Sequence, residues 1–111
     1  MRVTTRHFLI SALLASVASA DPRLRGSLAR GVVEIRGDGF APHATLDVVV
    51  DPAWPHASIA CNAARTRTVH ADARGRFAIE LAPRGECRLA PDRYRAYADR
   101  DGIELAVSRP F

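Results

Sequence analysis

Lysine is absent from this chain of 111 residues: all 16 basic residues are arginine, and they stand against 12 acidic residues. A run of basic residues that would follow a nucleic-acid backbone is missing too, because the arginines alternate with aspartate and glutamate along the chain. We therefore expect no sequence-specific binding of nucleic acid. The arginines on strand faces are interpreted as solvated surface residues.

A long hydrophobic run is also missing. The longest one, at 8–17, has about ten mainly apolar residues, whereas a membrane span needs roughly 20. A basic start precedes it and small residues follow at 18–20, which is typical of a secretory signal peptide and its cleavage site. We expect residues 1–20 to be removed, with Asp21 as the mature N-terminus. No cysteine follows the run, so no lipid or other membrane anchor is expected, and the protein is predicted to be secreted or periplasmic.

The patterns of an active site are lacking as well. Ser27, Ser58 and Ser108 lie outside any nucleophile-elbow pattern. The carboxylates fall mostly at outward strand positions or in turns, and a pair such as Asp47 and Asp51 is interpreted as a polar sheet face rather than an acid–base couple. We predict no catalytic residue, no cofactor and no metal site, and therefore a protein that is not an enzyme.

Two cysteines, Cys61 and Cys87, remain after the expected cleavage. In an exported domain an even count favours one disulfide, which would close a loop of about 27 residues and stabilise the fold by about 3.5 kcal/mol. A metal site with one of His43, His56 or His70 is an alternative, but the cysteines show no CxxC pairing and the histidines are scattered. A second alternative is a pair of free thiols.

The mature chain is long enough for one domain with a small core. Residues 21–31 are expected to form a loose arm or an edge strand. From 32 to 111 apolar and polar residues alternate between Gly, Pro or Asp clusters, and no helical period is sustained. We predict a hairpin of 66–71 with 76–81, and a second tight turn at 99–102. Seven or so short strands indicate an all-β, seven-stranded antiparallel sandwich with immunoglobulin-like topology.

The expected core consists of apolar residues at the inward positions of this pattern, and they should be largely buried between the two sheets. These residues are Phe40, Leu46, Val48, Phe77, Ile79, Leu81, Tyr94 and Leu105.

The single tryptophan, Trp54, lies between Pro52 and Pro55. Together with Phe40 and Ile59 it is expected to line a ligand cleft, since exposed aromatic residues at a sandwich end are common binding elements. Alternatively, Trp54 fills one end of the sandwich.

Several segments together resemble the neocarzinostatin-type apoproteins, which are secreted bacterial carriers of enediyne chromophores. Residues 33–40 look like the opening strand and turn of that family. The Ala53-Trp54 step looks like the exit of the family's next strand. Residues 68–75 look like a hairpin of that family, and residues 99–111 look like its closing hairpin. The ordered set covers nearly all of 32–111 and consists of 33–40, 46–48, 53–54, 59–62, 68–75 and 99–111.

The resemblance implies a seven-stranded sandwich with an attached ribbon, and a cleft between them that holds an apolar chromophore. By position, Trp54 and Ile59 match cleft-lining residues. The family has two short-range disulfides, of which Cys61 and Cys87 match one half each, so they either pair with each other or are both free. The ribbon is cut to 83–87, and a cleft without this wall should bind weakly.

The leading hypothesis is therefore a secreted, monomeric, non-catalytic binding protein for a small apolar ligand, antibiotic-related by resemblance. The alternative is a secreted immunoglobulin-like module that interacts with proteins or with the cell envelope.

Overall fold

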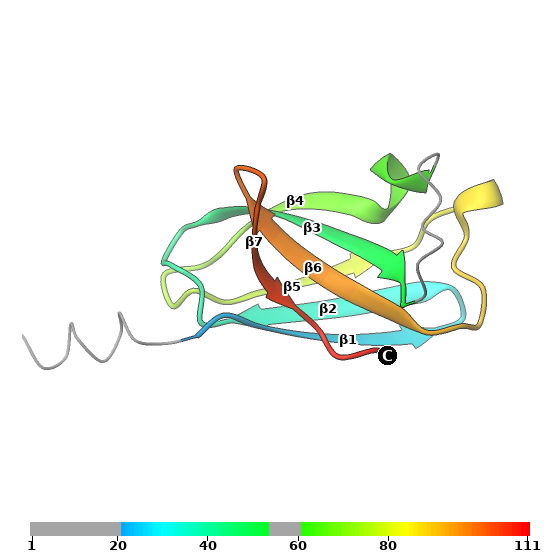
Figure 1. The fold of residues 1–111 in the computed structure, drawn as a ribbon, viewed down its shortest axis with the longest axis horizontal. Coiled ribbons are helices and arrows are strands. Elements are labelled where there is room, and N and C mark those ends of the chain that lie inside the picture. Colours follow the sequence, from blue (N-terminus) through cyan, green and yellow to red (C-terminus); the bar gives the residue numbers. More distant parts are fainter. Residues whose placement is uncertain (1–20, 54–60) are drawn as a thin grey trace, which may run out of the picture.

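The computed structural model describes residues 21–53 and 61–111 (Figure 1). The predicted signal peptide at 1–20, as well as Trp54 and Ile59, lies outside the described residues. Within them, no helix is long and apolar enough to cross a membrane. The described elements are seven strands and two short 3-10 helices: β1 (Arg23–Ala29), β2 (Val32–Asp38), β3 (Thr45–Pro52), η2 (Ala63–Arg65), β4 (Thr66–His70), β5 (Phe77–Leu81), η3 (Gly85–Cys87), β6 (Tyr94–Arg100) and β7 (Ile103–Val107).

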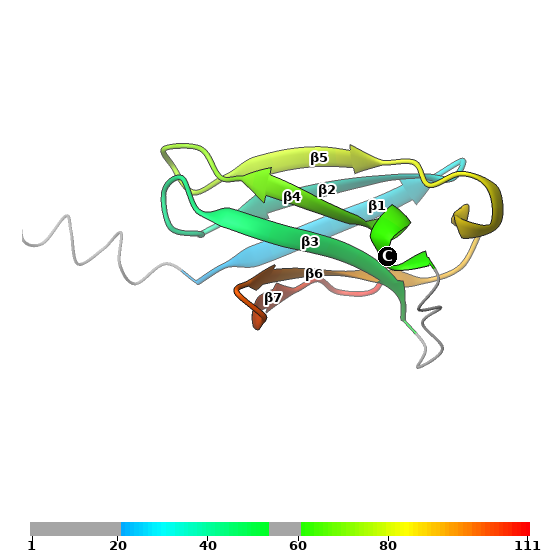
Figure 2. The ribbon, with the colours of Figure 1, turned by 90° about the horizontal axis from the view of Figure 1, so that it is seen from above.

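The strands form two antiparallel sheets, one in the order β1-β2-β5 and the other in the order β4-β3-β6-β7. The two sheets lie one over the other, as the side view and the view from above both show (Figure 1 and Figure 2). The all-β prediction with two antiparallel sheets is confirmed.

The segment at 21–31 is a regular edge strand rather than a loose arm. Its residues pair one by one with β2, from Arg23 with Asp38 to Ala29 with Val32. Arg30 and Gly31 connect the two strands, and both have positive φ, 53° and 76°. Two-residue loops of this left-handed kind match the twist of a hairpin, and glycine adopts the conformation without steric cost.

The core lies between the sheets and is built from alternating strand residues. Phe40, Leu46, Val48, Leu81 and Tyr94 are buried as predicted. Phe77 and Ile79 of β5, which were also expected in the core, are half-buried and pack against it. The largest fully buried side chains are Ile35, Leu46, Leu89, Val33, Val48 and Val50.

The prediction that Leu105 belongs to the core is wrong, because this side chain is 39% exposed. The register between β6 and β7 shifts at a bulge, where Ala98 pairs with Ala106 but Asp99 pairs with Glu104. A one-residue change of register moves side chains to the other face of a sheet. Leu105 is the extra residue at this bulge and has no partner on β6, so its side chain stays exposed, whereas Ala106 and Ser108 are buried.

The predicted hairpin of 66–71 with 76–81 is also wrong. β4 pairs with β3, whereas β5 pairs with β2 in the other sheet. The tight turn between them does form, since the Gly75 N–H donates to the Asp72 carbonyl at 3.0 Å. The turn carries the chain from one sheet to the other, and the local turn sequence does not distinguish such a crossing from a hairpin.

The Asp72 side chain anchors this crossing, because its Oδ1 accepts backbone N–H groups from Arg76 and Arg74 at 2.9 and 2.8 Å. Hydrogen bonds first from Arg76 and then from Arg74 hold the pKa of the Asp72 carboxyl below its usual range.

A lowered pKa in the folded state makes Asp72 stabilising above the pKa of the unfolded chain, and this contribution is lost as the pH falls through the folded-state value. We expect wild type to be more stable than Asp72→Asn at neutral pH, since a neutral amide accepts these bonds more weakly. The difference should shrink on acidification. Urea unfolding of both proteins across the acid range checks this, and a difference that does not depend on pH would contradict it.

Candidate functional site

One end of the sandwich is held together by a disulfide. Cys61 and Cys87 are bonded, with their Cα atoms 5.2 Å apart. This confirms the favoured pairing and rules out both alternatives, the free thiols and the metal site, because both sulfur atoms are used in the bond. The bond ties η3 to the chain segment that precedes η2.

A buried arginine adds to this attachment. Arg65, 8% exposed, donates Nε and Nη2 hydrogen bonds to the Cys87 carbonyl at 3.3 and 3.2 Å. Its guanidinium lies 6.0 Å from the centre of the Tyr94 ring, within cation–π range. The Tyr94 hydroxyl in turn donates to the Ala90 carbonyl at 2.9 Å. The loop that follows β5 is therefore held at two points, at Cys87 by Cys61 and Arg65 and at Ala90 by Tyr94.

A hollow of about 400 Å³ opens between this loop, the turn after β1 and the end of the chain. Its apolar floor contains Leu89, which is buried, and Leu28 and Phe111, which are half-buried. Arg30 and Arg88 are exposed at its rim. We call it the disulfide-end hollow, and its lining residues are Leu28, Arg30, Gly31, Arg88, Leu89, Ala90, Pro91, Asp92 and Phe111.

The lining chemistry suits non-covalent binding. It includes one carboxylate, Asp92, whose Oδ1 accepts the Arg93 N–H at 2.7 Å, and no hydroxyl, thiol or imidazole group. Concave sites of roughly 300–1,000 Å³ with an apolar lining and a few polar groups are typical of small-molecule binding. The floor offers apolar contact, and the two rim guanidinium groups offer donors and positive charge for an acidic group.

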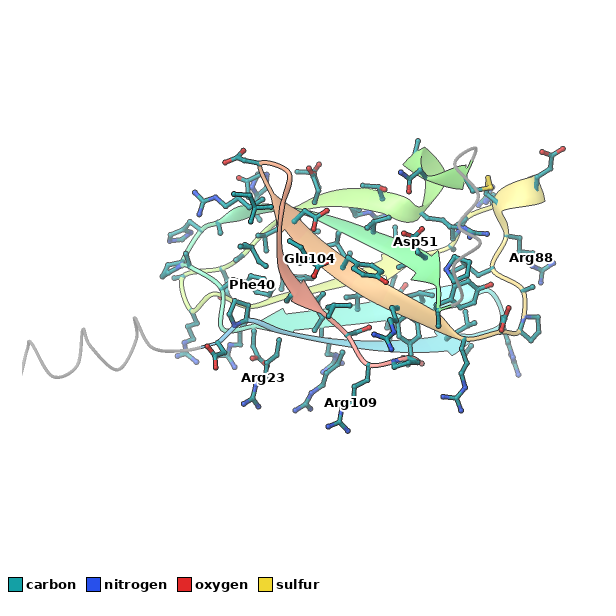
Figure 3. The ribbon with its side chains drawn as sticks, in the orientation of Figure 1. Arg23, Phe40, Asp51, Arg88, Glu104 and Arg109 are labelled. Carbon is teal, nitrogen blue, oxygen red and sulfur yellow. A yellow bond between two sulfur atoms is a disulfide. The ribbon has the colours of Figure 1, made fainter. Side chains whose placement is uncertain are left out.

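Phe40, one of the three residues predicted to line a ligand cleft, lies far from this hollow. It is 5% exposed and its ring centre is 5.6 Å from that of Phe77. Phe40 precedes β3 and Ala53 follows it, and Figure 3 shows Phe40 and Arg88 at opposite ends of the sandwich. Phe40 therefore serves the core.

The two other predicted cleft residues, Trp54 and Ile59, lie outside the described residues, so their role stays a prediction. The described residues on either side, Ala53 and Cys61, are both at the disulfide end. The Ala53 N–H donates to the Arg93 carbonyl at 2.8 Å, and Cys61 is bonded to Cys87.

Sequence reasoning missed the floor of the hollow. Leu28, Leu89 and Phe111 come from three distant segments, and only the strand pairing brings them together. The available signal was Leu89, a single large aliphatic residue in an otherwise polar, Gly- and Pro-rich loop.

Within 21–53 and 61–111, no group of three His, Cys, Asp or Glu side chains is placed to hold a metal ion. No protein-family model matches this chain. No curated protein matches its sequence either.

Proposed function

We propose that this protein is an exported, non-catalytic binding protein that holds a small apolar ligand in the disulfide-end hollow. The observation that carries the proposal is a concave surface of about 400 Å³ whose floor is apolar and whose rim carries Arg30 and Arg88. The adjacent disulfide fixes the loop that forms one wall, so little conformational entropy is lost when a ligand binds.

We further infer an immunoglobulin-like topology. This inference is supported by the strand order, in which the sheet β1-β2-β5 faces the sheet β4-β3-β6-β7. The resemblance of 32–111 to the neocarzinostatin-type apoproteins supports a carrier role. Cys61 bonded to Cys87 departs from the two short-range disulfides of that family.

The ligand class follows from the lining. An apolar body would contact Leu28, Leu89 and Phe111, and an acidic substituent would meet Arg30 and Arg88. Binding would come mainly from apolar area, at roughly 25 cal/mol per Å² before the costs of association. A hollow that is open on one side buries only part of a ligand, so we expect a dissociation constant of about a micromolar or weaker.

The proposal predicts that an additional carboxylate placed in the hollow weakens binding of an anionic apolar dye without unfolding the protein. The probe is 8-anilinonaphthalene-1-sulfonate, an apolar dye with one acidic group, followed by its fluorescence. Ala90 lines the hollow and is exposed, so Ala90→Glu should weaken dye binding about tenfold or more. Ala82→Glu is the matched control, because Ala82 is exposed in the same loop but does not line the hollow.

Equal dye affinity in wild type and both variants would contradict the proposal, as would equal weakening by the two substitutions. In that case the alternative of a module that interacts with proteins or with the cell envelope is favoured. Native circular dichroism spectra for both variants are required for this comparison, because unfolded chains also bind the dye.

A further inference from the structure

A second hollow, of about 680 Å³, lies where the first half of β1 meets the segment that follows β7. One of its walls consists of residues 22–26, and the other consists of Val107 and residues 109–111. We call it the C-terminal hollow. It shares one lining residue, Phe111, with the disulfide-end hollow, and the two are otherwise built from different parts of the chain.

Hydrogen bonds hold the second wall in place. The Phe111 N–H donates to the Tyr94 carbonyl at 2.9 Å, and the Tyr94 N–H donates to the Phe111 carbonyl at 3.0 Å. The buried Ser108 accepts the Ala96 N–H on its Oγ at 2.9 Å, and this hydroxyl donates to the Arg109 carbonyl at 2.9 Å. Arg109 therefore lies between two fixed points of the chain.

The two walls meet where the Phe111 ring lies on the backbone of β1 at Gly26. A side chain at position 26 would collide with the ring atoms, so glycine allows this close approach. The hollow is therefore a fixed feature of the fold, bounded on one side by an aromatic ring.

The charge of the C-terminal hollow is of one sign. Among the described residues, three arginines line it, Arg23, Arg25 and Arg109, and no acidic side chain does. All three are exposed, and Figure 3 shows Arg23 and Arg109 extending from the same side of the sandwich. Arg23 lies opposite Asp38 on β2, but Arg25 lies directly opposite Arg36, so its cross-strand neighbour does not neutralise it.

A neighbouring hollow of about 430 Å³, on the outer face of the same sheet, provides a contrast. It is also lined by three arginines, but Asp38 and Asp72 line it with them. Positive and negative charges are therefore balanced within that hollow. In the C-terminal hollow the described lining supplies no such partner, so the counter-charge has to come from a bound anion or from ions in the solvent.

We propose that the C-terminal hollow binds an anion with two negative charges and an apolar substituent, of which an aryl phosphate monoester is the simplest example. Guanidinium groups form paired hydrogen bonds with phosphate oxygens, so three of them suit a phosphate group better than a single negative charge. The apolar substituent contacts Val107, which is 42% exposed, and the half-buried Phe111 ring.

This inference goes beyond the proposed function and does not depend on it. The phosphate group meets Arg23, Arg25 and Arg109, and none of these lines the disulfide-end hollow. The two hollows therefore take different ligands and can be tested separately.

The probe is phenyl phosphate, whose binding is followed by the amide signals of the isotope-labelled protein in nuclear magnetic resonance spectra. The pH is kept above 7, because the second pKa of a phosphate monoester is about 6. We expect a dissociation constant of about a millimolar, since the hollow is open and its arginines are exposed. Inorganic phosphate should bind several-fold more weakly, because it has no ring to contact Val107 and Phe111. Equal affinities would refute the apolar part of the proposal.

Arg25→Ala and Arg109→Ala should each weaken phenyl phosphate binding about fivefold or more, because each removes one positive charge from the hollow. The matched control is Arg67→Ala, which removes an exposed arginine from β4, an edge strand of the other sheet. It should leave the dissociation constant nearly unchanged. Equal weakening by all three variants would overturn the proposal, because the anion would then respond only to the net charge of the protein.

The Ala90→Glu variant separates this inference from the proposed function. It should bind phenyl phosphate as tightly as wild type does, because Ala90 does not line the C-terminal hollow. Weaker phenyl phosphate binding by Ala90→Glu than by Arg25→Ala would place the anion in the disulfide-end hollow and overturn the inference. Weaker binding of 8-anilinonaphthalene-1-sulfonate by Arg25→Ala alone would instead contradict the proposed function. A wild type whose amide signals do not move at about 10 millimolar phenyl phosphate would also overturn the inference.

Discussion

Replacing Phe40 by alanine is expected to lower the free energy of unfolding by roughly 3–5 kcal/mol, the usual cost of removing a buried aromatic side chain. Phe40 is 5% exposed, its ring packs on that of Phe77, and its N–H donates to the Gly75 carbonyl at 3.2 Å. Small domains have total stabilities of about 5–15 kcal/mol, so this loss is a large fraction of the total. Urea unfolding followed by circular dichroism measures it.

The control is Phe77→Ala, which removes a half-buried ring from the same contact and should cost less than Phe40→Ala. The double variant completes a cycle that isolates the ring pair, for which we expect a coupling of about 0.5–1.5 kcal/mol. A stable Phe40→Ala protein with weakened dye binding would instead support the sequence-based prediction that Phe40 contacts ligand.

Removing the disulfide should lower the free energy of unfolding about as much as Phe40→Ala does. The bond closes a separation of 26 residues between Cys61 and Cys87. In the chain-entropy model such a loop stabilises the folded state by about 3.5 kcal/mol, because it restricts the unfolded chain. We expect the double variant Cys61→Ser, Cys87→Ser to lose about this much free energy of unfolding. Replacing both cysteines avoids a reactive single thiol.

Reduction of the wild-type protein serves as the control, since it should lower the unfolding midpoint by a similar amount without any substitution. Leu89 and Arg88 follow Cys87 directly, so dye binding in the disulfide-end hollow should weaken in the double variant even below its unfolding midpoint. A loss of stability below about 1 kcal/mol would contradict the prediction and indicate that the Arg65 hydrogen bonds to the Cys87 carbonyl suffice.

The sequence predicted the positions of the strands better than it predicted which strands pair with each other. Alternation of apolar and polar residues identified β2, β3 and β5, since side chains of a strand point alternately to its two faces. The same pattern did not reveal that β4 and β5 belong to different sheets, because the turn at Asp72 is local and the pairing is not. The exposure of Leu105 depends on a bulge beside Asp99, which leaves no mark on the alternation of apolar and polar residues.

The candidate site was harder to predict than the fold. Expectation centred on Trp54 with Phe40 and Ile59, and Phe40 proved to be a core residue. The floor of the hollow joins Leu28 on β1, Leu89 in a loop and Phe111 at the end of the chain. No periodicity links these positions. They meet because β1 and the end of the chain lie near each other on one side of the sandwich, which is a property of the whole topology.

The crossing of the chain between sheets at Asp72 also has a kinetic consequence. Because of this crossing, β4 and β5 belong to different sheets. Two pairings, β1 with β2 and β6 with β7, are hairpins whose strands are joined by two-residue loops. The central pairings, such as Asp47 with Asp99 and Val33 with Leu81, join residues from distant parts of the chain. Contacts of long sequence separation slow folding, typically to milliseconds or seconds in sandwiches. The chain would thus be exposed to proteases and to other unfolded chains for longer than a helical domain of the same length.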